Sequence, residues 1–238
     1  MSTGEQVGIL EEMELYHVLN RGVDKRTIFL DDRDRFRFVH DLYEFNDQHS
    51  ALTFRDPSVD IVSPQMRHRH RERSLLVDIH GWCLMKNHYH LLLSERVEGG
   101  MSLFLRKLNV GYAKYFNEKH KRSGYLFQGR TKKVLIEHDA QFNYILPYIH
   151  LNPLDYLKGA EGWRIRSKGK GIKSVKAALH YLENYRWSSY LDYCGKKNFP
   201  SILTTDFFAN GKEHQDMIRE YLERDENGEN EYAPLFLE

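Results

Sequence analysis

The chain has 238 residues, of which 41% are hydrophobic and 29% charged, and its formal net charge at pH 7 is +1. This length suffices for one medium-sized domain with an extension, and the apolar content excludes a wholly disordered chain. Two cysteines, Cys83 and Cys194, are too few for a disulfide framework. Residues 1–19 lack the basic start and apolar run of a secretory leader, and no stretch holds the roughly 20 apolar residues of a membrane-spanning helix. We therefore expect a soluble, cytoplasmic protein.

The pattern of hydrophobic residues divides the first two thirds of the chain into strands and helices. Runs rich in β-branched and aromatic residues predict strands, and apolar residues at helical spacing after a capping residue predict helices. In chain order these are a strand over 14–20, a helix over about 31–48, strands over 75–85 and 88–94 joined by a turn at Lys86 and Asn87, a helix over 102–116, a strand over 132–137 and a helix from 138 to about 153. Residues 56–74, with two prolines and several serines, are expected to form a flexible loop insertion.

The order β-α-β-β-α-β-α predicts an α+β fold of the ferredoxin-like, split βαβ type, with an antiparallel sheet and helices packed on one face. After Pro153 the pattern weakens, although helices are expected over 175–185 and 206–224. We predict a main domain over 1–158, a small helical C-terminal extension over 159–222 and an acidic flexible tail over 223–238.

Charge is distributed unevenly along the chain. Residues 67–73 read RHRHRER, and residues 119–133 combine lysine and arginine with glycine, tyrosine and phenylalanine. Basic segments of this kind suit a polyanionic partner such as a nucleic acid, although solvated surface loops would show the same pattern.

The segment His88-Tyr89-His90 carries the sharpest local signal for chemistry. In a strand, residues two apart project from the same face, so the imidazoles of His88 and His90 can reach one metal ion. The chain has 13 histidines, so a chance pairing is the competing interpretation.

The helix that begins near residue 138 places Tyr148 and Asn152 four residues apart, on one face. A phenol can attack phosphorus if a cation stabilises its ionised form. The amide oxygen of Asn152 could complete a metal shell. Alternatively, Tyr148 packs in the core and Asn152 caps the helix before Pro153.

Four segments in order, WCLMKNHYHLLL, GYLFQGR, YIHLNP and WSSY, resemble the single-tyrosine HUH transposases, and most closely the REP-associated tyrosine transposases. The resemblance spans residues 16–193 and makes residues 1–158 the catalytic domain. It implies that His88 and His90 bind a divalent metal, that Tyr148 is the nucleophile and that Asn152 is a third ligand. Tyr89 departs from the aliphatic residue that the family usually has between the histidines. Other tyrosines compete with Tyr148 as the nucleophile, with Tyr115 as second choice, and they are Tyr89, Tyr112, Tyr115, Tyr125 and Tyr144.

The resemblance further implies single-stranded or hairpin DNA as partner, Mg²⁺ or Mn²⁺ as cofactor, and DNA nicking and strand transfer through a 5′-phosphotyrosine intermediate. Basic and aromatic residues of the helix over 102–116 and of the segment that follows it are the expected DNA contacts. They are Arg106, Lys107, Lys114, Tyr125, Phe127, Gln128, Arg130, Lys132 and Lys133.

Two other functions fit the same sequence. A module that binds single-stranded nucleic acid without catalysis could use the same fold. A hydrolase of small phosphate esters could use His88, His90 and a carboxylate such as Asp78. A monomer and a homodimer both remain compatible with the sequence.

Overall fold

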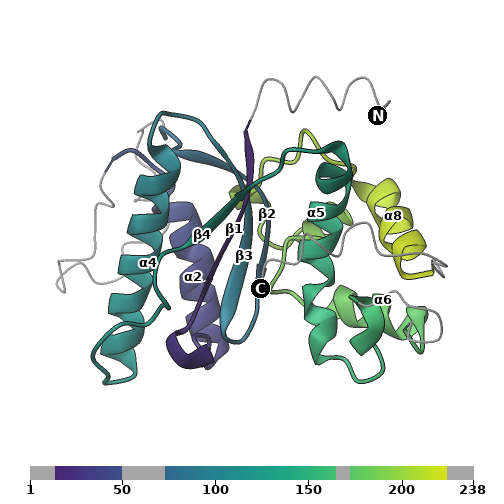
Figure 1. Cartoon of the computed structure of the whole chain (residues 1–238), viewed down its shortest axis with the longest axis horizontal. Helices are drawn as coiled ribbons and strands as arrows, with labels where there is room; N and C mark the ends of the chain where they lie inside the picture. The colour runs from purple at the N-terminus through teal and green to yellow at the C-terminus, as the bar shows by residue number, and fades with distance from the viewer. Residues whose placement is uncertain (1–13, 50–72, 165–171, 224–238) are drawn as a thin grey trace.

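The computed structural model describes residues 14–49, 73–164 and 172–223. A four-stranded antiparallel sheet in the order β2-β3-β1-β4 lies at its centre, with helices on either side (Figure 1). The strands are β1 (Leu15–Arg21), β2 (Val77–Leu84), β3 (His88–Glu95) and β4 (Lys132–Leu135). The helices are α2 (Asp32–Glu44), α4 (Gly100–Lys119), α5 (Asp139–Leu151), α6 (Val175–Asn184), α7 (Tyr190–Tyr193) and α8 (Gly211–Glu223), with short 3-10 helices at Val23–Lys25, Asn152–Tyr156, Glu161–Trp163 and Pro200–Ile202.

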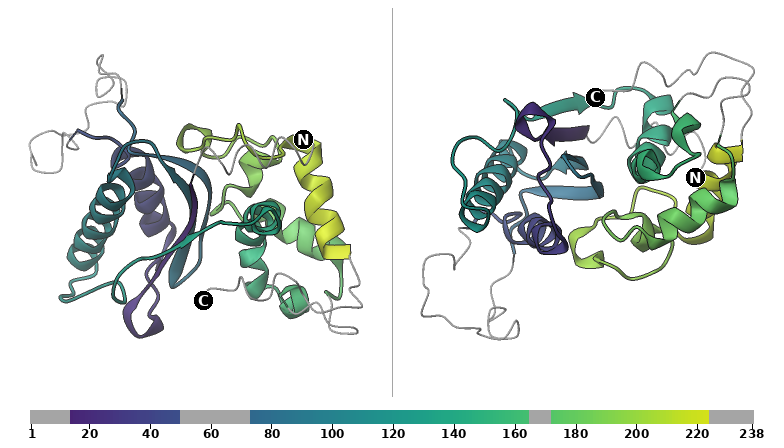
Figure 2. Two further views of the ribbon diagram at one scale, coloured as in Figure 1. Left: turned by 45° about the horizontal axis from the view of Figure 1, so that its top comes forward. Right: turned by 90° about the horizontal axis from the view of Figure 1, so that it is seen from below.

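The predicted α+β class and antiparallel sheet are confirmed. α2 and α4 pack on one face of the sheet, as expected, and share a core with Tyr89, Leu91 and Leu93 of β3. The opposite face is covered as well. α5 packs there with the C-terminal helices, in a second core that contains Leu92 of β3 (Figures 1 and 2). The C-terminal extension thus packs against the sheet. β3 is buried on both faces along its whole length except at Glu95, its last residue, which is exposed.

Gly81 lets α5 approach β2 closely. A Cβ atom at this position would lie 2.6 Å from Cδ1 of Leu146 on α5. The strand register also shifts here, between Ile79 and Gly81, as in a β-bulge. Because α5 carries Tyr148, this close approach sets the distance between that helix and the histidines of the neighbouring strand.

The ends of α2, α4 and α8 differ from the sequence prediction. α2 ends at Glu44 instead of near residue 48. α4 begins at Gly100, before Ser102, because Gly99 takes a positive φ of 72° and its carbonyl accepts the amide of Leu103. α8 begins at Gly211 instead of 206. The predicted tail and nearly all of the loop insertion over 56–74 lie outside the described residues.

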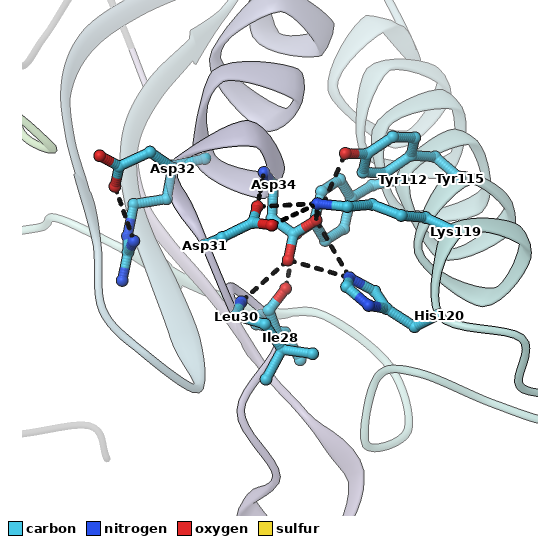
Figure 3. Close-up of polar contacts among 10 residues, drawn as sticks. Ile28, Leu30, Asp31, Asp32, Asp34, Tyr112, Tyr115, Lys119 and His120 are labelled. Carbon is cyan, nitrogen blue, oxygen red and sulfur yellow. Dashed lines mark hydrogen bonds and ion pairs between the residues drawn. The ribbon is translucent and has the colours of Figure 1, made fainter.

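A buried carboxylate joins the N-terminal end of α2 to the C-terminal end of α4 (Figure 3). Asp34, fully buried, accepts hydrogen bonds from Nζ of Lys119 at 2.7 Å and from the backbone amide of Leu30 at 2.9 Å, and its oxygens lie 3.1 and 3.2 Å from Nε2 of His120. Lys119 also binds Asp31, the N-cap residue of α2. The cluster fixes the end of α4 and hence the start of the connection to β4.

Both cysteines are free thiols in buried positions. Among the described residues, no helix is both long enough and apolar enough to cross a lipid bilayer.

Candidate active site

The two histidines of β3 lie on the face of the sheet that α5 covers. His90 pairs with Leu19 on one side and with Cys83 on the other, so it sits in the middle of the sheet. The ring centroids of His88 and His90 are 4.9 Å apart. Tyr89 points to the opposite face, where its hydroxyl donates to Asn109, so the bulky residue between the histidines does not crowd them.

The tautomer of His88 follows from its neighbour. Nδ1 of His88 lies 2.7 Å from Oδ1 of Asn87, and because an amide oxygen only accepts hydrogen bonds, Nδ1 carries the proton. Nε2 is then the nitrogen with the lone pair. Burial, followed by the charges of Arg21 and Arg164, lowers the pKa of His88 to about 4. His88 is therefore neutral near pH 7, as a metal ligand must be.

His17 is a third imidazole that the sequence analysis missed. It projects from β1, stacks on His90 with a ring-centroid distance of 5.2 Å, and places Nε2 at 2.9 Å from Nδ1 of His90. Burial lowers the pKa of His17 to about 3, so one neutral ring donates to the other. When Nδ1 of His90 donates to His17, Nε2 of His90 keeps its lone pair. Metal-ligating histidines are commonly oriented in this way, by a hydrogen bond from the ring nitrogen that does not bind the metal. A histidine at an inward-facing position of β1 was the available signal.

Tyr148 meets these histidines from α5, and Asn152 follows as the C-cap of that helix. The ring centroid of Tyr148 lies 5.8 Å from that of His17 and 5.9 Å from that of His90, and Tyr148 is 1% exposed. Nδ2 of Asn152 donates to the backbone carbonyl of Tyr148 at 2.8 Å. The structure thus places Tyr148 against His90, which lies beside His88, and joins Asn152 to the backbone of Tyr148.

Arg164 contacts both Tyr148 and Asn152. Nη1 donates to the hydroxyl of Tyr148 at 2.9 Å, and Nη2 donates to Oδ1 of Asn152 at 2.7 Å. The guanidinium also forms a two-pronged ion pair with Asp155 and lies 4.3 Å from the ring centroid of Trp163. The sequence analysis did not single out Arg164, because no local pattern points to it.

The donor set fits a divalent metal in part. The lone-pair nitrogens of His88 and His90 and the oxygen of Asn152 would hold it, since an amide oxygen has a second lone pair besides the one that faces Arg164. No cluster of three or more histidine, cysteine, aspartate or glutamate side chains is arranged to hold a metal within 14–49, 73–164 and 172–223. An ion at this site would therefore need ligands from outside that group, such as Asn152 or a substrate oxygen.

The rival tyrosines lie elsewhere. Tyr115 and Tyr112 are on α4, behind the sheet, where Tyr115 donates to Asp34 at 3.3 Å and Tyr112 donates to the carbonyl of Ile28 (Figure 3). Tyr144, one turn before Tyr148, hydrogen-bonds through its hydroxyl to that of Tyr221 on α8 at 2.6 Å. Of the tyrosines considered for the nucleophile, Tyr148 is the one in contact with the histidine cluster.

A groove of about 650 Å³ lies between α4 and the chain that leads into β4. Tyr125, 88% exposed, projects there, while Phe127 packs against Tyr89 and lines its base. Five of the residues predicted to contact DNA line it: Arg106, Tyr125, Phe127, Arg130 and Lys133.

The other four predicted DNA contacts are placed differently. Lys107 donates to the carbonyls of Asp47 and His49, and Lys114 lines a separate hollow between α2 and α4. Gln128 bonds through its backbone amide to the carbonyl of Arg21, and Lys132 is exposed on β4.

A polar network at one side of the groove was not anticipated. Oγ1 of Thr131 accepts hydrogen bonds from the side-chain amides of Asn20 at 3.1 Å and Asn109 at 2.9 Å. These residues come from β1, α4 and the segment before β4, so the groove is fixed by long-range contacts.

Asp78 is not part of the site. It pairs in register with Ser94, far along β3 from His88, and it binds Arg96 and Thr204 at 2.7 Å each. The predicted role of Asp78 in a phosphate-ester hydrolase is wrong, because strand geometry holds it at the other end of the hairpin.

No family model matches the chain, and no curated protein matches it. Solved structures are among the proteins that the chain resembles. One of them is described as "Structure of the REP associates tyrosine transposase bound to a REP hairpin", and it is 13% identical in sequence. The match covers 83% of this chain and 90% of that one, with a TM-score of 0.44.

Proposed function

We propose that the chain is a metal-dependent transposase-like enzyme that nicks single-stranded DNA and transfers the strand, with Tyr148 as the nucleophile. The observation that carries this proposal is the position of the Tyr148 ring, less than 6 Å between ring centroids from both His17 and His90. Tyr148 and His90 come from distant segments and meet on one face of the sheet, and the sequence motifs predict a role in this chemistry for both.

The chemistry is a transesterification. The Tyr148 oxygen attacks the scissile phosphorus, a bond forms between them, and the bond from phosphorus to the 3′ oxygen breaks. The phenolic proton passes to solvent and the departing 3′ oxygen takes up a proton. The 5′-phosphotyrosine keeps the energy of the phosphodiester, so a second 3′-hydroxyl can reverse the reaction without ATP.

His88, His90 and Asn152 would hold the metal. When bound, Mg²⁺ or Mn²⁺ acts as a Lewis acid toward the scissile phosphate. Two imidazoles make a softer site than Mg²⁺ prefers, which favours Mn²⁺ in assays. Asn87 and His17 keep the two ligating rings in fixed orientations.

The groove beside α4 is the proposed DNA-binding surface. Arg106, Arg130 and Lys133 would bind phosphates and supply affinity that falls with salt. Tyr125 would stack on an unpaired base, because an exposed aromatic ring is a sequence-tolerant platform for single strands.

The test is covalent capture. Purified protein is incubated with Mn²⁺ and labelled single-stranded and hairpin oligonucleotides, then separated on a denaturing gel. We expect a slow protein–DNA band that Tyr148→Phe and His88→Ala both abolish. Tyr144→Phe is the matched control, because it removes a buried hydroxyl from the same helix and should keep the band. A band that survives in Tyr148→Phe would refute this nucleophile.

The burial of Tyr148 favours one competing function, a nucleic-acid-binding module without catalysis. Such a module would bind the oligonucleotides with the metal chelated and would form no covalent band with any substrate.

A further inference from the structure

We propose that Arg164 is a catalytic residue that binds the scissile phosphate beside Tyr148, an inference that rests on the proposed function. Among the described residues, Arg164 is the cation that contacts both the Tyr148 hydroxyl and the Asn152 oxygen. No sequence motif includes it. Its position alone suggests the role.

Access to Tyr148 requires the Arg164 contact to change. Tyr148 is 1% exposed, whereas 19% of the Arg164 side chain is exposed. An incoming phosphate therefore meets the guanidinium before it meets the phenol. A substrate that reaches the Tyr148 oxygen must replace the hydrogen bond that Nη1 donates to it.

The exchange is favourable because the partners differ in charge. The Tyr148 hydroxyl and the Asn152 amide are neutral acceptors, while a phosphodiester oxygen carries negative charge. Replacing a neutral acceptor of the guanidinium with an anionic one adds Coulombic attraction between opposite charges, and the planar fork of arginine matches phosphate geometry. The guanidinium should therefore pass from the phenol to the phosphate and leave the two groups adjacent.

Two neighbours keep the guanidinium in place during this exchange. The carboxylate of Asp155 accepts hydrogen bonds from Nε of Arg164 at 3.1 Å and from Nη2 of Arg164 at 2.7 Å. It also accepts a hydrogen bond from Nε1 of Trp163 at 2.6 Å. Trp163 stacks on the guanidinium. Because this clamp holds the Nε side, the Nη1 side remains directed at the reacting oxygen.

A first experiment needs no catalysis. Trp163 reports on Arg164 through the stacking contact, so its fluorescence is followed during titration with the dinucleoside phosphodiester dTpdT, with the metal chelated. We expect a saturable change that is lost in Arg164→Ala and Trp163→Phe. The change should also be at least 10-fold weaker for the methylphosphonate analogue, which is neutral. Arg96→Ala is the matched control, since Arg96 also pairs with an aspartate but lies beyond the far end of β3. No change with parent protein, or equal binding of the neutral analogue, would overturn the proposal.

A second experiment measures the reaction. At saturating DNA we expect Arg164→Ala to lower the single-turnover rate of adduct formation about 100-fold. Arg164→Lys should recover part of the loss, and added methylguanidinium should partly rescue Arg164→Ala. Equal or faster reaction of Arg164→Ala would show that Arg164 only covers Tyr148. If the parent forms no adduct with any substrate, the proposed nuclease function fails, while the dTpdT titration still decides whether Arg164 binds phosphate.

Discussion

The side-chain oxygen of Asn87, in the turn between β2 and β3, lies 2.7 Å from Nδ1 of His88, the first residue of β3. The amide of Asn87 is itself held, because Nδ2 donates to the carbonyl of Lys25 at 3.2 Å. A turn residue next to β3 thus decides which nitrogen of His88 carries the proton.

Asn87→Ala should weaken Mn²⁺ binding about 10-fold, because His88 loses the partner that orients its ring and selects its tautomer. The dissociation constant can be measured by electron paramagnetic resonance of free Mn²⁺ in the absence of DNA. Asn184→Ala, which removes an exposed asparagine at the end of α6, is the control and should bind as the parent does. Unchanged affinity in Asn87→Ala would argue against His88 as a ligand.

Tyr115→Phe should leave adduct formation unchanged. Its hydroxyl points to Asp34 on the face of the sheet away from the histidines, and the substitution removes the 3.3 Å hydrogen bond to that carboxylate. Asp34 keeps Lys119 as a partner, so the free energy of unfolding should fall by at most about 1 kcal/mol. Urea unfolding and the denaturing-gel assay check the two halves of this prediction. Loss of the covalent band with a normal unfolding curve would move the nucleophile to Tyr115.

Tyr125→Ala should reduce affinity for single-stranded oligonucleotides by about 1–3 kcal/mol, the usual contribution of one stacked base. Because Tyr125 is 88% exposed, the melting temperature should not change. Fluorescence anisotropy at two salt concentrations gives the affinity and the electrostatic part separately. Leu30→Ala removes another exposed apolar side chain, outside the groove, and serves as the control. Equal binding by Tyr125→Ala and the parent would place the DNA elsewhere.

Stability should fall in mild acid because of His214. Burial lowers the pKa of this histidine from 6.5 to about 4. Between pH 4 and pH 6.5 the histidine is therefore protonated in the unfolded chain but neutral in the folded chain. The stabilising effect is complete above pH 6.5 and is lost as the pH drops toward 4. From pH 7 to pH 5 the loss attributable to His214 is about 2 kcal/mol. Urea unfolding of the parent and of His214→Gln at both pH values tests this, and the same pH dependence in both would contradict it.

Local periodicity was enough to predict the pairs of residues within one element. His88 and His90 share a face because a strand repeats every two residues, and Tyr148 and Asn152 stack because a helix brings every fourth residue together. The side of the sheet that α5 would cover could not be predicted this way. Both faces of the central strands are apolar, so the choice depends on packing contacts such as Leu146 against Gly81.

Arg164 and His17 were missed for a related reason. Each acts through partners distant in the chain, His90 for His17 and Tyr148 for Arg164. Their own surroundings in the sequence are an ordinary strand and a glycine-rich basic segment. A hydrogen bond between such segments leaves no trace in periodicity or composition.

The C-terminal segment around Trp187 and Ser189 hydrogen-bonds to the outer side of β2. The amide of Leu84 bonds to the carbonyl of Trp187, and the amide of Ser189 bonds to the carbonyl of Trp82, at 2.9 Å each. β2 is an outer strand of the sheet, and an exposed outer strand is a template for adding a strand from another molecule. At the other border, β4 presents the exposed lysines Lys132 and Lys133, whose charges disfavour the same event. The two outer strands are therefore protected in different ways, and both features disfavour the joining of two copies of the chain into one continuous sheet.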